Sequence, residues 1–459
     1  MGGWNVRKRI TVNAQERSLT RSLSWPHLMA MGVGAIVGTG ILTLIGIGAD
    51  KAGPAVLLSF LIAGFVCACA ALAYAEMAST IPASGSAYTY NYVVLGEVVA
   101  WIIGWSLILE YSLVVSAVAV SWSGYAAPLL HDWLGLPMAL MQGPHAGGVA
   151  NVPALFIILI IAGMLIIGTR KSATLNLALV VVKLSALVLF VWFALPHFNA
   201  ANLEPFNPYG FGRAMGEDGV ERGIMAAAAI IFSAFYGFDA IATAAEETKK
   251  PERDLAIGIV GSMVVCTVLY IAVAAAAIGA APVASFADSP EPLAHIMRGL
   301  GQGVAAQWIA AAAVIALPTV LLAFLFGQSR IFLGMSRDGL LPNRLAKISK
   351  RGVPAVVTVF TAIVVAFLAG IMRLDELASL ANAGTLMAFM AVGVSLIVLR
   401  VREPNRERKF KAPLWWLVGG IAIVVCIVFF FSLKSSTQLY FLLWNLFGLA
   451  LYLLWSSRN

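Results

Sequence analysis

Charged side chains are scarce in this sequence. Only 11% of its 459 residues are Asp, Glu, Lys or Arg, whereas 61% are hydrophobic, and the mean hydropathy is +0.90. Soluble globular domains carry about 25% charged residues, so this composition excludes an ordinary water-soluble fold. It is typical of an integral membrane protein whose apolar surface faces lipid.

Cysteine and histidine are also rare. The four cysteines all lie in apolar runs, where a thiol acts as a small hydrophobe, so we expect no disulfide and no metal site. The five histidines lie at the ends of apolar runs or in loops, which argues against a histidine proton relay. No phosphate-binding loop, metal-ligand cluster or nucleophile–base pair occurs, so we expect neither an enzyme nor a cofactor. The first 24 residues are polar, which predicts no cleavable signal peptide.

Apolar runs long enough to span a bilayer follow one another along the chain. We predict twelve spans, at residues 26–48, 55–78, 94–126, 152–169, 174–195, 223–245, 256–280, 304–332, 354–371, 377–399, 414–433 and 437–456. With the N-terminus inside, the inner segments hold 23 Lys and Arg residues and the outer segments hold 6. This asymmetry predicts that both termini are cytoplasmic, with long outer loops at 129–151 and 196–222. It assigns the net charge of +8 to topology rather than to nucleic acid.

The first run contains four glycines between Gly32 and Gly40. Each glycine costs a helix roughly 1 kcal/mol relative to alanine. Gly34 and Gly38, four residues apart, would suit close packing against another helix. Gly38-Thr39-Gly40 would suit a broken helix that exposes amides and carbonyls to a solute. The residues of this run alone leave both interpretations open.

The sixth run carries a similar interruption. Gly237 and Asp239 lie in the middle of the span at 223–245. The first and sixth spans open two blocks of five, and corresponding interruptions in two halves indicate a transporter site built on inverted repeats. Glu246 and Glu247, at the inner mouth of the sixth span, are interpreted as a solvated helix end.

Three ionisable residues lie deep within spans and are functional candidates: Glu110, Lys183 and Asp239. Lys183 lies about 13 Å past Thr174 along its helix, which is too deep for the ammonium to reach an interface. It is either a structural cation or a proton carrier. Glu110 is either a hydrogen-bonded structural carboxyl or a participant in proton movement. Asp239 is favoured as an acceptor for amides freed by the break.

Ordered motifs run from about residue 24 to residue 430. They are Gly34-Ala-Ile-Val-Gly-Thr-Gly-Ile, Ala52-Gly-Pro-Ala, Ile81-Pro-Ala-Ser-Gly-Ser-Ala-Tyr-Thr-Tyr, Tyr236-Gly-Phe-Asp-Ala, Ala245-Glu-Glu-Thr-Lys-Lys-Pro-Glu-Arg-Asp and Ser336-Arg-Asp-Gly-Leu-Leu-Pro. In these motifs the chain resembles the amino acid–polyamine–organocation (APC) superfamily. The Glu-Glu-x-Lys-x-Pro-x-Arg-Asp segment and Lys183 resemble, within it, the bacterial branch of the cationic amino acid transporter family.

The resemblance implies an all-α polytopic membrane protein of the LeuT type, with two inverted five-helix repeats and two additional C-terminal helices. The implied boundaries are 1–24 for a cytoplasmic N-terminal segment, 25–200 for the first repeat, 201–400 for the second repeat and 401–459 for the last two helices and the C-terminus. The implied breaks lie near 36–40 and 235–239.

The resemblance also implies a substrate site at the two breaks. The substrate α-carboxylate would meet backbone amides near Thr39 and Gly40, at a helix N-terminus. The α-amino group would meet carbonyls near Ile36, Ser233, Ala234 and Tyr236. Two of these positions depart from the family, since Ser233 stands where phenylalanine is frequent and Tyr236 where isoleucine is frequent.

Lys183 is implied to stand where related symporters hold a sodium ion, with the backbone of Gly34 as its partner. We therefore expect a proton-coupled amino acid symporter of the bacterial inner membrane that works by alternating access and does not need sodium. The alternative is an amino acid exchanger of the same fold in which Lys183 is a structural cation. The expected partners are the amino acid and membrane lipids, without nucleic acid. A small membrane subunit or a homo-oligomer leaves no readable pattern in the sequence.

Overall fold

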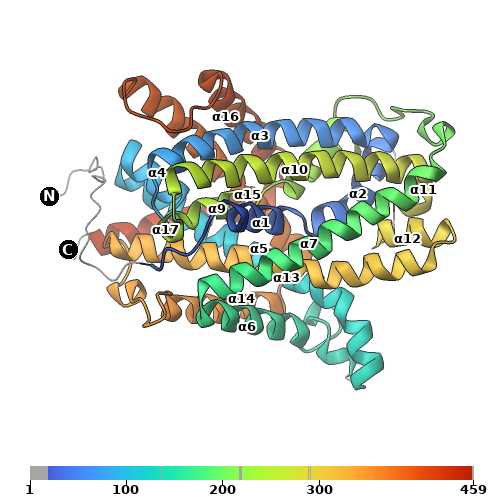
Figure 1. Cartoon of the computed structure of the whole chain (residues 1–459), viewed down its shortest axis with the longest axis horizontal. Helices are drawn as coiled ribbons and strands as arrows, with labels where there is room; N and C mark the ends of the chain where they lie inside the picture. Colours follow the sequence, from blue (N-terminus) through green and yellow to red (C-terminus); the bar gives the residue numbers. More distant parts are fainter. Residues whose placement is uncertain (1–18, 136, 217–219, 288, 290, 457–459) are drawn as a thin grey trace.

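Long helices aligned along one direction form most of the molecule (Figure 1). The computed structural model describes residues 19–135, 137–216, 220–287, 289 and 291–456. Within these residues, eight helical stretches are long and apolar enough to cross a membrane. Three further apolar helices have 16 or 17 residues. A mostly helical, polytopic membrane protein is thereby confirmed, as expected where lipid offers the backbone no hydrogen bonds.

Each predicted apolar run coincides with one helix or with a helix pair. The first half of the chain contains α1 (Trp25–Ile36), α2 (Thr39–Ala52), η1 (Gly53–Ala55), α3 (Val56–Thr80), α4 (Ala87–Val94), α5 (Glu97–Leu134), η2 (Met138–Leu140), η3 (Pro144–Ala146), α6 (Val152–Ile167), α7 (Thr169–Ala194), η4 (Leu195–His197) and η5 (Ala200–Leu203). A short hairpin of β1 (Ala214–Met215) and β2 (Glu221–Arg222) follows.

The second half is built from α8 (Ile224–Ile231), η6 (Phe232–Ala234), α9 (Asp239–Thr243), η7 (Ala245–Glu247), α10 (Pro251–Ala280), α11 (Val283–Phe286), α12 (Pro292–Gly299), α13 (Gly303–Arg337), η8 (Asn343–Ala346), α14 (Ala355–Ile371), α15 (Leu374–Arg402), α16 (Trp415–Phe431) and α17 (Ser435–Ser456).

The two ends of the bundle carry different short elements. Figure 1 places α4 at one end, which we call the α4 end, and α11 and α12 at the other. The α4 end also holds the C-terminal end of α13, because the Tyr88 hydroxyl of α4 donates to Asp338 at 2.8 Å. Ser84 and Glu246 meet there as well, which brings η7 to the same end.

Pro318 inside α13 leaves one backbone carbonyl of this helix without its helical hydrogen bond, and a side chain of α5 binds that carbonyl instead. Pro318 has no backbone N–H, so the carbonyl of Val314, four residues earlier, loses its helical donor. The indole Nε1 of Trp122 on α5 donates to this carbonyl at 2.9 Å and replaces the missing bond. The next residue, Thr319, uses its side chain at the site described below.

Three indoles fasten the last helix to the bundle. Trp105 of α5 donates to the carbonyl of Trp444 at 2.9 Å, and Trp444 donates back to the carbonyl of Trp105 at 3.0 Å. The two rings stack with centroids 4.7 Å apart. Trp101 donates to the carbonyl of Gly448 at 2.8 Å, one turn further along α17. These bonds keep buried indole N–H groups satisfied and fix α17 against α5.

Candidate functional site

The first apolar run is a broken helix. α1 ends at Ile36, and the backbone leaves helical geometry at Val37 (φ −75°, ψ 96°) and Gly38 (φ −145°, ψ −139°) before α2 begins. The glycines before the break serve close packing. A Cβ on Gly32 would meet the Cβ of Ser262 at 2.7 Å, and one on Gly34 would lie 3.1 Å from Oδ1 of Asn176. The run is therefore a broken helix, and the glycines before the break pack closely against neighbouring helices.

The second break lies between η6 and α9. Gly237 has φ +118°, a conformation that only glycine adopts without strain. A Cβ at this position would lie 3.0 Å from the carbonyl carbon of Ala35, next to the first break. In return, a Cβ on Gly40 would lie 2.6 Å from Cα of Ala234. The two breaks are thus in direct contact, and each uses a glycine at the point of contact.

Lys183 of α7 extends its ammonium to the first break. Its Nζ donates to the carbonyls of Gly34 at 2.8 Å and Val37 at 2.5 Å, and to the hydroxyl of Thr319 at 2.7 Å. The Thr319 hydroxyl itself donates to the Gly34 carbonyl at 3.0 Å. An ammonium has three N–H donors, and these three oxygens satisfy all of them. Lys183 is 2% exposed, so this cage takes the place of water.

Gly34, the backbone partner that the family resemblance implies, does bind the Lys183 ammonium, but Val37 and Thr319 were not predicted as partners. The only sequence signal of Thr319 is its position directly after Pro318, where the helix is perturbed. Lys183 and Thr319 are 136 positions apart, so no local pattern joins them.

Tyr270 of α10 is a second residue that the sequence analysis missed. Its hydroxyl lies 2.8 Å from the carbonyl oxygen of Ile36 and 3.1 Å from that of Ala234, so it bridges the two breaks. The residue is fully buried. A tyrosine hydroxyl inside an apolar helix needs acceptors, and this is the only signal that the sequence offers.

The remaining predicted substrate residues lie around the same place. Ser233 is half-buried, and its hydroxyl donates to the carbonyl of Ile230 in its own helix at 2.7 Å. Tyr236 is half-buried and packs edge-on against Phe324 of α13, with centroids 6.3 Å apart. The side chain of Thr39 lies outside the described part of the structure. The predicted residues of the two breaks thus come together, with α10 and α13 beside them.

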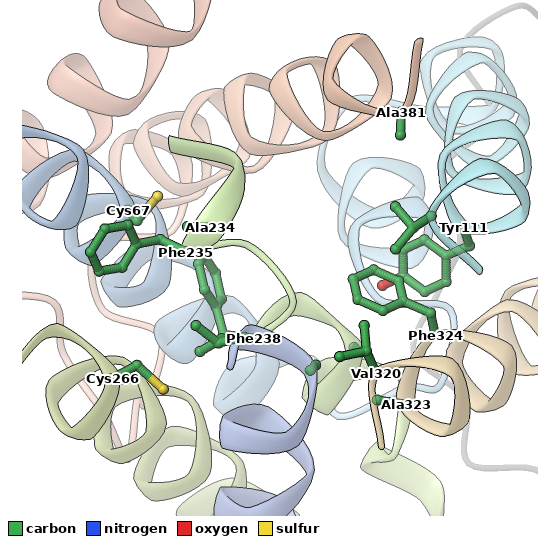
Figure 2. Close-up of a cluster of buried hydrophobic side chains, with 14 of the residues drawn as sticks. Cys67, Tyr111, Ala234, Phe235, Phe238, Cys266, Val320, Ala323, Phe324 and Ala381 are labelled. Carbon is green, nitrogen blue, oxygen red and sulfur yellow. The ribbon is translucent and has the colours of Figure 1, made fainter. Parts of the chain in front are cut away.

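The two predicted intramembrane carboxyls lie on α5 and α9. Asp239 accepts a hydrogen bond from the Tyr111 hydroxyl and one from the amide of Gly237 at 3.2 Å, so it does bind an amide freed by the break. Figure 2 shows Tyr111 beside Phe324, and the two rings meet edge-on at 5.1 Å. Glu110 accepts from the Thr385 hydroxyl at 2.6 Å, and its other oxygen has no hydrogen-bond partner in the described part of the chain.

Apolar residues fill the space around these polar groups. Figure 2 shows Ala234, the last residue of η6, and Phe235, which follows it, between Cys67 of α3 and Cys266 of α10. Both cysteines are buried and free. Their surroundings are apolar, which agrees with the expectation that they act as small hydrophobes.

The interpretation of Glu247 as part of a solvated helix end is wrong. Glu247 is fully buried, and Arg330 of α13 donates to it twice, from Nε and from Nη2, each at 3.0 Å. The guanidinium lies 3.7 Å from the ring centroid of Phe326. The backbone carbonyl of Glu247 accepts from the amides of Ser22 and Leu23, both at 2.9 Å. This residue therefore ties the segment before α1 to α13 at the α4 end.

Glu246 is half-buried and also paired. Arg337 donates to it at 2.6 Å and the Ser84 hydroxyl at 2.7 Å. It follows the membrane-crossing stretch Ile224–Thr243. Burial raises the pKa of Glu246, but the Arg337 guanidinium and the hydrogen bonds from Ser84 outweigh it, so the pKa lies below its ordinary value.

Membrane-crossing helices, two helix breaks in contact and a buried cation bound to the first break are together typical of a permease for a small solute. The chain belongs to the amino acid permease family, whose model matches residues 23–454. This confirms the resemblance to the APC superfamily, and the protein is a transporter rather than an enzyme.

Similar proteins of known name are also transporters or permeases. The chain is 42% identical over 461 residues to the branched-chain amino acid permease BcaP of Bacillus subtilis (strain 168), covering 99% of this chain and 97% of that protein. It is 39% identical to the methylthioribose transporter of the same organism, covering 98% of this chain and 96% of that protein. It is 38% identical to the vacuolar cationic amino acid transporter 2 of Arabidopsis thaliana, over 85% of this chain and 61% of that protein.

Proposed function

We propose that this permease imports neutral, aliphatic amino acids together with protons by alternating access. The substrate class is supported by the likeness to a branched-chain amino acid permease across nearly the whole of both chains. It is also supported by Asp239, the carboxyl nearest the second break, which is already engaged by Tyr111 and Gly237. A cationic side chain would need a carboxylate that is available to pair with it.

The α-carboxylate of the substrate would bind backbone amides near Thr39 and Gly40, at the N-terminus of α2, where the helix dipole favours an anion. The α-amino group would bind carbonyls of the two breaks near Ile36 and Ala234.

Proton coupling rests on one observation, the oxygen cage around the Lys183 ammonium. Two of its three oxygens are backbone carbonyls of the broken segment of α1. If α1 moves during transport, these bonds are lost, and a buried ammonium without partners is costly. The two conformations therefore bind the proton with different affinity, which is the condition for coupling.

The same cage supports one alternative. Because all three N–H groups are satisfied, Lys183 could remain charged throughout the cycle and act as a structural cation. The protein would then be an amino acid exchanger of the same fold.

The architecture and orientation belong to the proposal as well. Residues 25–200 and 201–400 would form the inverted five-helix repeats of a LeuT-type fold, and 401–459 would add two helices, giving twelve spans. The excess of Lys and Arg in the predicted inner segments of the sequence supports cytoplasmic termini in a bacterial plasma membrane.

Transport in proteoliposomes tests coupling directly. Wild-type protein should accumulate radiolabelled leucine when the outside is acidic, lose accumulation with a protonophore, and be indifferent to sodium replacement. Lys183→Met removes the charge at similar length and should abolish accumulation while leucine counterflow continues. Lys51→Met is the matched control, because Lys51 also donates to a backbone carbonyl, that of Glu221 at 2.7 Å, but near the end of a helix.

Each outcome separates the alternatives. Sodium-dependent uptake, or accumulation by the Lys183→Met variant equal to that of the wild type, would rule out the proton-carrier role. Strict exchange without net uptake in the wild type would establish the exchanger. Absence of binding to any of the twenty amino acids in a thermal-shift panel would remove the proposed substrate class.

A further inference from the structure

The two buried carboxyls near the second break differ in how their oxygens are satisfied. Asp239 receives a hydrogen on each oxygen, one from the Tyr111 hydroxyl and one from the amide of Gly237 at 3.2 Å. Glu110, which precedes Tyr111 in α5, receives at most one hydrogen, from the Thr385 hydroxyl at 2.6 Å, and its Oε2 atom has no partner among the described residues. An ionised carboxylate needs donors on both oxygens, so the surroundings of Asp239 suit the ionised form and those of Glu110 do not.

No positive charge among the described residues compensates Glu110, which is fully buried. The helices packed against α5 are α4, α6, α13, α14, α15 and α17, and none of their described charged side chains interacts with the carboxyl. The titratable side chains that do interact with it are all acids, which carry a negative charge or none: Asp239, Tyr74, Tyr111 and Tyr236. A carboxylate that lacks both a counter-charge and donors is so costly in an apolar interior that it takes up a proton instead.

Thr385 can serve both protonation states of this carboxyl. Its hydroxyl has one hydrogen and lies within hydrogen-bond distance of two acceptors, Oε1 of Glu110 at 2.6 Å and the carbonyl of Ala381 at 3.3 Å. Beside a carboxylate, the hydroxyl donates to Glu110. Beside the neutral acid, Glu110 donates to the hydroxyl oxygen, and the hydroxyl donates to Ala381, one helical turn earlier. A separation of 2.6 Å suits an O–H···O bond in either direction.

We propose that Glu110 is a second proton-binding site of this permease, in which the Thr385 hydroxyl changes from donor to acceptor when the carboxyl takes up the proton on Oε1. A neutral Glu110 removes the repulsion between two negative charges, so Asp239 stays ionised and continues to hold the amide of Gly237 in the second break. The site thus links a proton to the second break, whereas Lys183 is bound to the first. This inference goes beyond the proposed coupling at Lys183 and does not depend on it, because the protonation of a carboxyl can be measured without transport.

Infrared spectroscopy of the full-length protein in proteoliposomes at neutral pH tests this site directly, since a neutral carboxyl has a C=O stretching band that a carboxylate lacks. Wild-type protein should show such a band, and Glu110→Gln should lose it. Glu110→Gln keeps the size of the side chain and a donor for the Thr385 oxygen, so its Tm should equal that of the wild type. Glu246→Gln is the matched control and should keep the band, because Glu246 is paired with Arg337 and its pKa lies below its ordinary value.

Thr385→Val provides a second test, which does not depend on folding of the Glu110→Gln variant. It leaves the neutral acid without its acceptor, so the band should move to higher frequency, and Thr385→Ser should return it to the wild-type position. Equal spectra of wild type and Glu110→Gln, or a band that stays in place in Thr385→Val, would overturn the inference. A wild-type protein that shows the band but does not accumulate leucine would instead remove the proposed function and leave this site standing.

Discussion

Glu247 and Arg330 form a buried ion pair at the α4 end, and single substitutions can remove the charge of either partner separately. Glu247→Gln leaves a buried guanidinium without its counter-charge, and Arg330→Met leaves a buried carboxylate. Both changes keep the approximate length of the side chain, so the loss of charge pairing dominates the effect. The double variant carries neither charge.

The magnitude follows from the geometry. The side chains of Arg330 and Glu247 are 1% and 0% exposed, and two hydrogen bonds of 3.0 Å join them. Removing one partner of such a buried pair costs about 3–5 kcal/mol, mostly because the other charge remains desolvated. The double variant lacks that penalty, so its loss should be clearly smaller than the sum of the two single losses.

Thermal unfolding of the purified protein in detergent measures the four members of this cycle. We expect a large decrease in Tm for each single variant and a partial recovery in the double variant. Arg298→Met is the control, because the Arg298–Glu291 pair is long, at 3.5 Å, and its side chains are 52% and 34% exposed. Such an exposed pair contributes about 0–1 kcal/mol. Additive losses in the cycle, or a control variant as unstable as the single variants, would refute the reasoning.

Three further predictions concern the substrate site, pH and orientation. Gly40→Val should abolish amino acid binding while the protein still inserts, because a Cβ there would lie 2.6 Å from Cα of Ala234, and near-normal affinity in a leucine thermal-shift assay would contradict it. Glu246→Gln should lower Tm at neutral pH, and its difference in Tm from wild type should shrink below about pH 4. Arg337 holds the folded-state pKa of Glu246 below its unfolded value, and the stabilisation is lost when the carboxylate is protonated. A difference in Tm that stays constant across the titration would count against this prediction. An impermeant thiol reagent should label Asn207→Cys in intact cells and Asn343→Cys only after permeabilisation, since both positions are exposed, and the reverse pattern would invert the orientation.

Local patterns predicted the helices and the place of both breaks, because run length, glycine position and a buried charge are all visible in short windows of sequence. Lys183 was found because a lysine in the middle of an apolar run has few explanations. Tyr270 and Thr319 were missed, since each acts through partners far away in the sequence: Tyr270 is 234 positions from Ile36. A hydroxyl in an apolar helix looks the same whether it bonds its own helix or bridges two others.

The error at Glu247 has a related cause. A glutamate next to lysines at a helix end has the same local sequence whether water or an arginine satisfies it. Its partner Arg330 is 83 positions away, and in the sequence this arginine is visible only as part of the inner positive charge. Pairing between distant helices decides which charges are buried, and the count of charges at each end of a span does not contain that information.

The contact between the two breaks has a consequence for how the molecule can move. Gly40 lies against Ala234, and Gly237 lies against Ala35, so each break occupies the space that the other would need for a small displacement. Close-packed surfaces of this kind switch between discrete arrangements and do not deform gradually. The two segments should therefore move as one unit, with few intermediate positions between them. The distance between paired spin labels on α2 and α9 should therefore stay the same with and without substrate, whereas distances from α9 to α5 should fall into separate populations whose proportions change with substrate.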